Sequence, residues 1–202
     1  MSHRRFHHPE HHEPFAFTKE SEETIAWWEQ KYPADRRAST VIPALWITQK
    51  QNQGWLSEPA LRAVADRLGM TYIRVYEIAT FYTMFQLSPV GKKAHVQLCG
   101  TTPCMLRGSE ALKEVCQRRI HHDPHHLSAD GNFSWEEVEC LGSCANAPMV
   151  QVFKDTYEDL TPELFEKVLD GFAAGKPPKP GSQIGRQASA PLGGPTTLKV
   201  KA

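Results

Sequence analysis

The chain has 202 residues, of which 40% are hydrophobic, and its acidic and basic side chains balance to a formal net charge of zero. This length allows one large domain or two small ones. The charge balance does not favour nucleic acid or an anionic membrane surface as a partner, and no apolar run approaches the roughly 18 residues of a membrane-spanning helix. The sequence shows no secretory signal peptide, so its five cysteines indicate a reducing compartment.

The first 18 residues, MSHRRFHHPEHHEPFAFT, are polar and hold half of the ten histidines. Scattered histidines can bind metal weakly, but a flexible, solvated tail is the favoured interpretation of residues 1–18. The segment lacks the Arg-rich face of a mitochondrial transit peptide and contains Glu10 and Glu13. A bacterial protein, or a mature chain, fits it better.

Residues 19–90 are predicted to form a helical bundle. Ser21 is expected to cap a first helix that stops at Pro33, and a second helix begins near Ser39 and ends before Gly54.

The third helix has the strongest pattern. Ser57 is expected to cap it and Gly69 to close it. Between them, apolar residues follow the i, i+3, i+4, i+7 spacing of one helical face: Leu61, Val64, Ala65 and Leu68. A fourth helix begins near Thr71, and its aromatic side chains are interpreted as core packing rather than as a docking surface.

Residues 91–175 are predicted to alternate strands and helices. Strands are expected at residues 95–98, 133–139, 149–153 and 157–160. A helix is expected at residues 105–119 and another from Thr161 onward. A right-handed βαβ unit followed by a β-hairpin and a helix is the thioredoxin arrangement. Cys116 lies on the apolar side of the helix at residues 105–119 and is interpreted as core packing.

The other four cysteines form two pairs, each on a loop that follows a predicted strand. Cys99 and Cys104 have the spacing C-x₄-C, and Cys140 and Cys144 have the spacing C-x₃-C. If these strands are parallel neighbours, their carboxyl ends lie side by side and bring the two loops together. Two chelating pairs suit a 2Fe–2S cluster, in which each tetrahedral iron takes two protein thiolates beside two bridging sulfides.

Three other kinds of cysteine site compete with the cluster. A structural zinc site also uses four cysteines and remains an alternative, although its usual form has C-x₂-C at both ends. A disulfide framework needs an oxidising compartment, and a redox-active dithiol has the spacing C-x-x-C, which is absent. Four unrelated buried cysteines would not explain the small residues that surround both pairs.

The composition of the two loops favours the cluster further. A 2Fe–2S centre with four thiolates carries a formal double negative charge, and reduction makes it triple, so it needs nearby backbone N–H donors. Pro103 fixes the backbone before Cys104, and the amino end of the following helix would point toward the cluster. The small residues that let the backbone approach are Gly100, Thr101, Thr102, Gly142 and Ser143.

The segments CGTTPCMLRGSEAL and ECLGSCANAPMVQV closely resemble the small iron–sulfur subunit of the NADH-dehydrogenase module of respiratory complex I. RVYEIATFYTMFQLSPVGK resembles the helical part of that family, so the resemblance runs from about Phe15 into the C-terminal tail. It implies a thioredoxin-like ferredoxin domain with one 2Fe–2S cluster, whose ligands fall on Cys99, Cys104, Cys140 and Cys144. The implied partner is a subunit that holds FMN, the NADH site and a further iron–sulfur cluster. The implied location is peripheral, on the cytoplasmic side of the bacterial inner membrane, or on the matrix side of the mitochondrial membrane if the protein is eukaryotic.

The predicted fold class is therefore α+β. Its parts are a flexible tail at 1–18, a helical bundle at 19–90, a thioredoxin-like 2Fe–2S domain at 91–175 and an extended Pro/Gly-rich tail at 176–202. Taken alone, this last tail is too irregular to form a core, whereas the resemblance implies that it runs over the flavin-bearing partner. Arg186 is then a candidate partner contact, against the default of a solvated arginine.

No G-x-G-x-x-G loop follows any predicted strand, and no Ser/His/Asp or paired-carboxylate site is evident. The chain is therefore interpreted as a one-electron carrier without catalytic residues, a subunit of NADH:quinone oxidoreductase whose flavin and NADH chemistry lie on another chain. Two alternatives stay open. One is the equivalent subunit of an NAD-linked hydrogenase or formate dehydrogenase. The other is a structural zinc scaffold.

Overall fold

A computed structural model describes residues 11–194 of the chain. The chain divides into two compact units, Met1–Val90 and Gly91–Ala202. Within the described range, none of the helices has the length and apolar character needed to cross a membrane.

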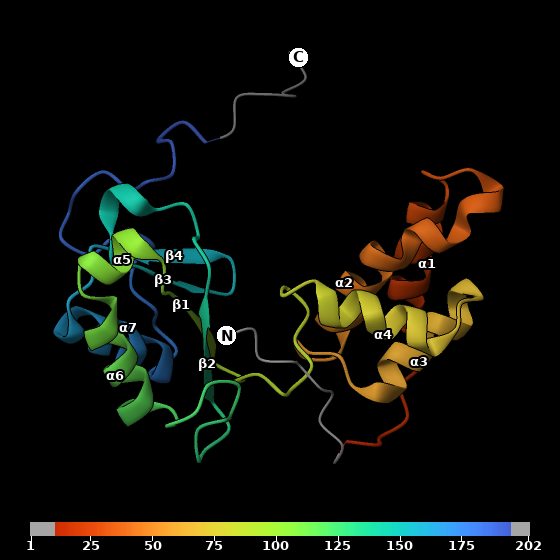
Figure 1. Ribbon diagram of the computed structural model, residues 1–202, viewed down its shortest axis with the longest axis horizontal. Helices are drawn as coiled ribbons and strands as arrows, with labels where there is room; N and C mark the ends of the chain where they lie inside the picture. The colour runs from red at the N-terminus through yellow and green to blue at the C-terminus, as the bar shows by residue number, and fades with distance from the viewer. Residues whose placement is uncertain (1–10, 195–202) are drawn as a thin grey trace. The chain divides into compact units, whose positions relative to one another are not determined.

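The first unit is helical (Figure 1). It contains α1 (Lys19–Glu29), the 3₁₀ segment η1 (Ala34–Thr40), α2 (Val41–Gln51), α3 (Glu58–Leu68) and α4 (Tyr72–Phe81). The pattern predicted for α3 is confirmed, because Leu61, Val64 and Leu68 are buried in the core of this unit. The ends of α3 are also as predicted. The Ser57 hydroxyl accepts the N–H of Ala60, and Gly69 ends the helix in the left-handed conformation at φ +65°.

Two helix starts differ from the prediction. Thr18, not Ser21, caps α1, because the Thr18 hydroxyl accepts the N–H of Ser21 at 3.2 Å and so draws Ser21 into the first turn. The second helix begins at Val41 rather than Ser39, because residues 34–40 wind as a 3₁₀ segment with a break at Arg36. Ser and Thr near a helix start compete for the capping position, and the sequence alone did not separate them.

An ion-pair network ties α1 to α3. The guanidinium of Arg67 donates to both carboxylate oxygens of Glu29, at 2.9 and 3.0 Å, and to Glu22 at 2.7 Å. Arg37 donates to Glu29 as well, at 2.6 Å. The bond from Arg67 is the largest influence on Glu29 and holds the pKa of its carboxyl below the ordinary value, against a smaller opposing effect of burial. The network therefore stabilises the bundle while Glu29 is ionised.

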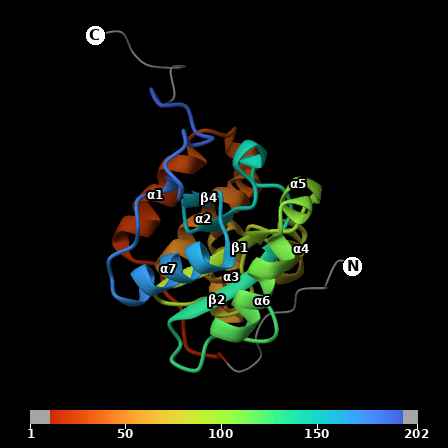
Figure 2. The same cartoon turned by 90° about the vertical axis from the view of Figure 1, so that its left-hand side faces the viewer.

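The second unit is a five-stranded sheet in the order β2-β1-β3-β4-β5. The strands are β1 (Ala94–Cys99), β2 (Phe133–Val138), β3 (Val150–Val152), β4 (Asp155–Glu158) and β5 (Gly181–Ser182). β1 and β2 run parallel, β3 is antiparallel to both β1 and β4, and β5 is parallel to β4. The helices α6 (Ser109–Arg119) and α7 (Pro162–Ala173) lie on one face of the sheet, as both views show (Figures 1 and 2).

The core of this unit lies between the sheet and these two helices. Val96 and Trp135 from the strands meet Leu112 of α6 and Phe165 of α7, all fully or almost fully buried. Cys116 is buried in the same cluster, so its interpretation as core packing is confirmed. The Trp135 indole N–H donates to the carbonyl of His121 at 2.8 Å, which gives the one polar atom of this large side chain a partner.

The prediction of a single helix at residues 105–119 is wrong, because two helices occupy this region. The structure has a short helix, α5 (Thr102–Leu106), followed by the separate α6. Gly108 lies between them at φ +102°, a backbone conformation that L side chains rarely adopt, and it ends the first turn before the second helix begins. Cys104 therefore lies inside α5, not ahead of a long helix.

The described part of the C-terminal tail has no core of its own but contains one short strand. Gly181 and Ser182 pair with Tyr157 and Glu158 as the edge strand β5. Arg186 is not simply solvated, because it donates to the almost fully buried carboxylate of Asp159 at 2.9 Å. The tail is thus attached to its own unit along residues 181–189.

Candidate metal centre

Cys99 and Cys104 occupy the end of β1 and the middle of α5. Both side chains are buried, each with 1% exposure. Thr101, between them, lies at the capping position of α5, and its hydroxyl is 3.3 Å from the Cys99 sulfur. Pro103 stands in the first turn of α5, where a missing N–H costs little. The local sequence thus turns the chain within two residues of the strand end and directs both thiols to one place.

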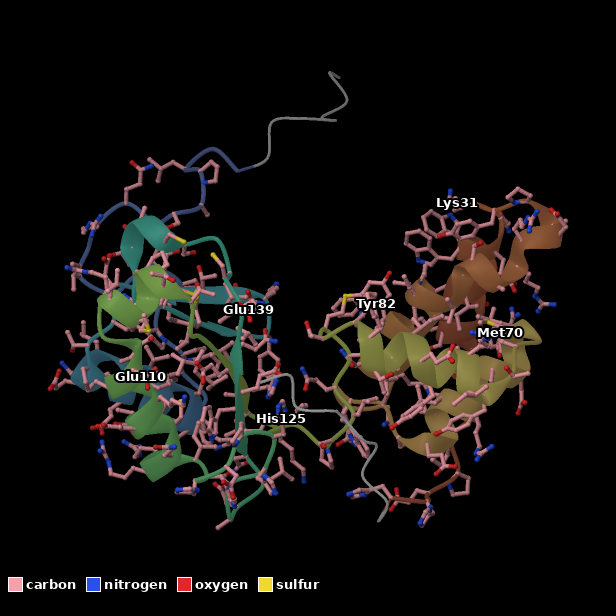
Figure 3. All side chains as sticks on the ribbon, in the orientation of Figure 1. Lys31, Met70, Tyr82, Glu110, His125 and Glu139 are labelled. Atoms are coloured by element: carbon pink, nitrogen blue, oxygen red, sulfur yellow. The ribbon has the colours of Figure 1, made fainter. Side chains whose placement is uncertain are left out.

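Cys140 and Cys144 follow β2 on an exposed loop (Figure 3, where Glu139 labels the residue before Cys140). Their sulfur atoms are 3.4 Å apart, and the Gly142 N–H lies 3.4 Å from the Cys140 sulfur. Gly142 has φ +89°, in the left-handed region that favours glycine. Cys144 then begins the short 3₁₀ segment η2 (Cys144–Asn146).

The parallel pairing of β1 and β2 brings the two loops together, as predicted. Cys99 is in register with Val138, and the Gly100 N–H donates to the Val138 carbonyl at 3.0 Å. A Cβ at Gly100 would overlap the side chain of Glu137, which would have to move to make room for it. Leu141, between the second pair of cysteines, packs on the cluster formed by Cys99, Cys104, Ala147 and Met149.

The hydrogen-bond donors around the buried sulfurs fit a negatively charged cluster. Burial disfavours the Cys99 thiolate, but the hydroxyl and N–H of Thr101, the Cys104 thiol and the N–H of Leu141 outweigh it and lower the pKa of the Cys99 thiol. Burial and the neighbouring Cys99 raise the pKa of Cys104 to about 12, against a weaker opposing bond from the Met149 N–H. These N–H groups would donate to ligand sulfurs once a metal replaces the thiol protons.

In the exposed pair, too, one cysteine raises the pKa of the other. The hydrogen bond with Cys140 raises the pKa of the Cys144 thiol because it favours the protonated donor, and burial and the charge of Cys140 act in the same direction. The charge of Cys99, in the first loop, acts on Cys144 in the same direction. This pair could therefore bind a cation, such as an iron of a 2Fe–2S cluster, which would favour the thiolate form of both side chains.

The four sulfurs are therefore grouped two and two. In residues 11–194, no three His, Cys, Asp or Glu side chains converge on a point suited to one metal ion. Cys116 belongs to the core beneath the sheet, and burial raises the pKa of its thiol far above the ordinary value. Arg107, the C-terminal cap of α5, is exposed.

Two contributions were not found by sequence reasoning. The backbone N–H of Leu141, on the second loop, lowers the pKa of the Cys99 thiol on the first, and nothing in the residue type of a leucine indicates this. The supports of the Cys144 loop, chiefly Asn146 and Glu158, lie outside the cysteine motifs. The Asn two positions after Cys144 was a signal in the sequence, since Asn side chains often bond to nearby backbone and carboxylates.

Residues 25–173 match the family of thioredoxin-like 2Fe-2S ferredoxins. The chain belongs to this family. It is 57% identical over 191 residues to an NADH-quinone oxidoreductase subunit of Rhizobium meliloti (strain 1021), a match that covers 92% of this chain and 68% of that protein. It is 50% identical over 141 residues to the NADH-quinone oxidoreductase subunit of the same type from Rickettsia bellii (strain RML369-C), with 70% and 84% covered.

Among solved structures, the chain is similar to an NAD+-reducing NiFe hydrogenase in its air-oxidised state, with a TM-score of 0.59 at 18% identity. The likeness covers 72% of this chain and 25% of the hydrogenase chain, so this chain spans about a quarter of that protein's length, and at such identity it shows the fold alone. The α+β class with a thioredoxin-like ferredoxin fold, the resemblance seen in the cysteine segments and the 2Fe–2S cofactor are all confirmed.

Proposed function

We propose that this ferredoxin is the electron-transfer iron–sulfur subunit of an NADH:quinone oxidoreductase. The observation that carries the proposal is the meeting of two cysteine pairs at the carboxyl ends of two parallel strands. The names of its relatives support it. When bound, a 2Fe–2S cluster takes up and gives back one electron.

In this proposal Cys99 and Cys104 hold one iron, and Cys140 and Cys144 hold the other. The N–H groups of Thr101, Leu141, Met149 and Gly142 donate to the ligand sulfurs and stabilise their negative charge. Burial of Cys99 and Cys104 excludes water from the first pair, whereas the exposure of Cys140 and Cys144 leaves the second pair open to a redox partner.

The proposed partner is a chain that holds the flavin and the NADH site. Residues 19–90 and 91–175 act as the helical and cluster-binding domains, and the division of the chain at Val90 and Gly91 supports this boundary. The tail at 176–202 is proposed to contact the partner, in part beyond the described residues. The complex is proposed to lie peripherally at the cytoplasmic face of a bacterial inner membrane.

Five single substitutions test the ligand set in the full-length protein. Serine at position 99, 104, 140 or 144 removes a thiolate, so iron and acid-labile sulfide per chain should fall well below the wild-type content. Cys116→Ser is the matched control, because Cys116 is a buried cysteine of the same domain outside both pairs. Full cluster content in Cys140→Ser, or complete loss in a folded Cys116→Ser, would overturn the assignment.

The carrier role is tested on the same preparation. The purified chain should absorb across the visible range and give an S = 1/2 signal after reduction by dithionite, which a zinc protein would not. It should oxidise NADH with an artificial acceptor only when the flavin-bearing chain is added. Turnover of NADH by the chain alone, shown free of flavin, would contradict the role.

The second candidate is the equivalent subunit of an NAD-linked hydrogenase, because part of a solved NAD+-reducing hydrogenase shares the fold of this chain. The two are told apart by the larger assembly that co-purifies with the chain, because one contains a quinone-reducing module and the other a nickel–iron subunit.

A further inference from the structure

The loop that carries Cys144 is hydrogen-bonded to a buried carboxylate, that of Glu158. Glu158, the last residue of β4, is fully buried. The side-chain amide of Asn146, two residues after Cys144, donates to one Glu158 oxygen at 2.8 Å, and the hydroxyl of Ser143 donates to the other at 3.3 Å. Glu158 is thus bonded to both sides of the proposed ligand.

Backbone bonds join the same two segments. The Asp159 N–H donates to the Asn146 carbonyl at 2.8 Å, and the Leu160 N–H donates to the Pro148 carbonyl at 3.0 Å. Asp159 has φ +56°, a left-handed conformation that is uncommon for residues other than glycine and that these bonds maintain. The chain after β4 is therefore shaped to receive the Cys144 loop.

The C-terminal tail closes over this junction. The Ser189 N–H donates to Glu158 at 2.9 Å, and the Asn146 amide also donates to the Gln187 carbonyl at 2.8 Å. Arg186 bridges the two segments. It donates to Asp159 at 2.9 Å and to the carbonyl of Ala145, next to Cys144, at 3.3 Å.

A buried carboxylate is costly unless its oxygens accept hydrogen bonds. Burial raises the pKa of Glu158, but the Ser189 N–H, the Asn146 amide and the Thr156 hydroxyl outweigh it, and its pKa lies below the ordinary value. These donors come from three segments, so removing one segment leaves a buried charge with fewer partners. The three segments are therefore stabilised together.

We propose that tail residues 181–189 and Glu158 form a clamp that positions the Cys144 loop for the metal centre, with Asn146 as the link. The clamp rests on the proposed function, because it matters to the cluster only if Cys144 is a ligand. Arg186, Asn146 and Glu158 act as positioning residues and do not touch the iron. The tail is then part of the cluster site, besides any contact it makes with a partner chain.

The test compares Arg186→Ala with Arg62→Ala in the full-length holoprotein. The two arginines are matched, since their side chains are 51% and 54% exposed and each pairs with one carboxylate, but Arg62 belongs to the helical unit. A bond to a charged group is lost in both. Iron release to a chelator should accelerate roughly tenfold in Arg186→Ala and stay at the wild-type rate in Arg62→Ala. Glu158→Gln should also shift the EPR signal of the reduced protein, because it removes a negative charge near Cys144.

A truncation gives an independent measurement. A chain that ends at residue 180 lacks the clamp, whereas one that ends at residue 192 keeps it. Amide hydrogen exchange of residues 140–147 should be faster only in the shorter chain, together with faster iron release.

The clamp is overturned if iron release and exchange are unchanged in both the shorter chain and Arg186→Ala. It is also overturned if exchange accelerates while iron release and the EPR signal keep their wild-type values, because the tail would then hold the loop without affecting the metal centre. Should the shorter chain fail to fold, the Arg186→Ala comparison decides. Full iron content in Cys144→Ser would instead contradict the ligand assignment, and the exchange measurement would still report on the clamp.

Discussion

Gly142 offers a sharp test of how the backbone positions a ligand. Its φ of +89° lies in the left-handed region, and a Cβ built there meets no atom within 4 Å, so Gly142→Ala introduces backbone strain without a collision. The strain destabilises the folded state by about 1–2 kcal/mol, whereas the lower conformational entropy of the unfolded chain stabilises the folded state by about 0.4–1 kcal/mol. The net destabilisation is about 1 kcal/mol, which lowers the Tm of a unit of this size by roughly 4 °C. The N–H of residue 142 should also move away from the Cys140 sulfur and weaken the hold on the cluster.

Gly131→Ala is the matched control. Gly131 has φ +69°, it too has open space around it, and it lies in the turn before β2, away from the cysteines. Calorimetry should give both variants a similar fall in Tm, whereas visible absorption in the presence of an iron chelator should show faster cluster loss only in Gly142→Ala. Equal rates of cluster loss in the two variants would refute the view that the conformation of Gly142 positions Cys140.

Two more predictions concern the core of the second unit and the ion-pair network between α1 and α3. Phe165→Ala empties a fully buried site and should destabilise the second unit by about 3–5 kcal/mol in denaturant unfolding, against less than about 1 kcal/mol for the half-exposed Phe153→Ala. Because Arg67 and Arg37 lower the pKa of Glu29, the stability this carboxylate contributes is present above the ordinary glutamate pKa and is lost as the pH falls through its lowered pKa. The stability difference between the wild type and Glu29→Gln should therefore shrink on acidification in that range, and a pH-independent difference would contradict the network.

Much of the fold follows from periodicity and from residues with one strong structural preference. Leu61, Val64 and Leu68 share a helical face because of their spacing alone, and Gly69 ends that helix because glycine accepts the left-handed conformation. The cysteine pairs were predictable for a related reason. Each follows a strand, and the parallel pairing of β1 and β2 sets the two strand ends side by side.

What the sequence left undetermined depends on tertiary contacts. Gly108 separates α5 from α6 within a sequence pattern that looks like one continuous helix. A glycine inside such a pattern can be tolerated or can end the helix, so the sequence alone did not predict the break. The tail from residue 181 onward shows no periodic spacing of apolar residues. It is held in place by backbone pairing and by polar bonds to Glu158 and Asp159. Polar partners that are distant in sequence leave no local pattern to detect.

The parallel register of β1 and β2 also bears on how the protein matures. Local folding brings only two sulfurs together at a time, and the two pairs come close to each other once the crossover through α6 has closed and the strands have paired. Closing a long crossover is slower than forming a helix or a hairpin. If the two pairs hold the cluster as proposed, a chain whose strands have not yet paired has two separate half-sites, neither of which would retain a complete cofactor. Substitutions that slow strand pairing would yield a population deficient in iron although its final fold is intact, and delivery of the cluster must wait for the sheet.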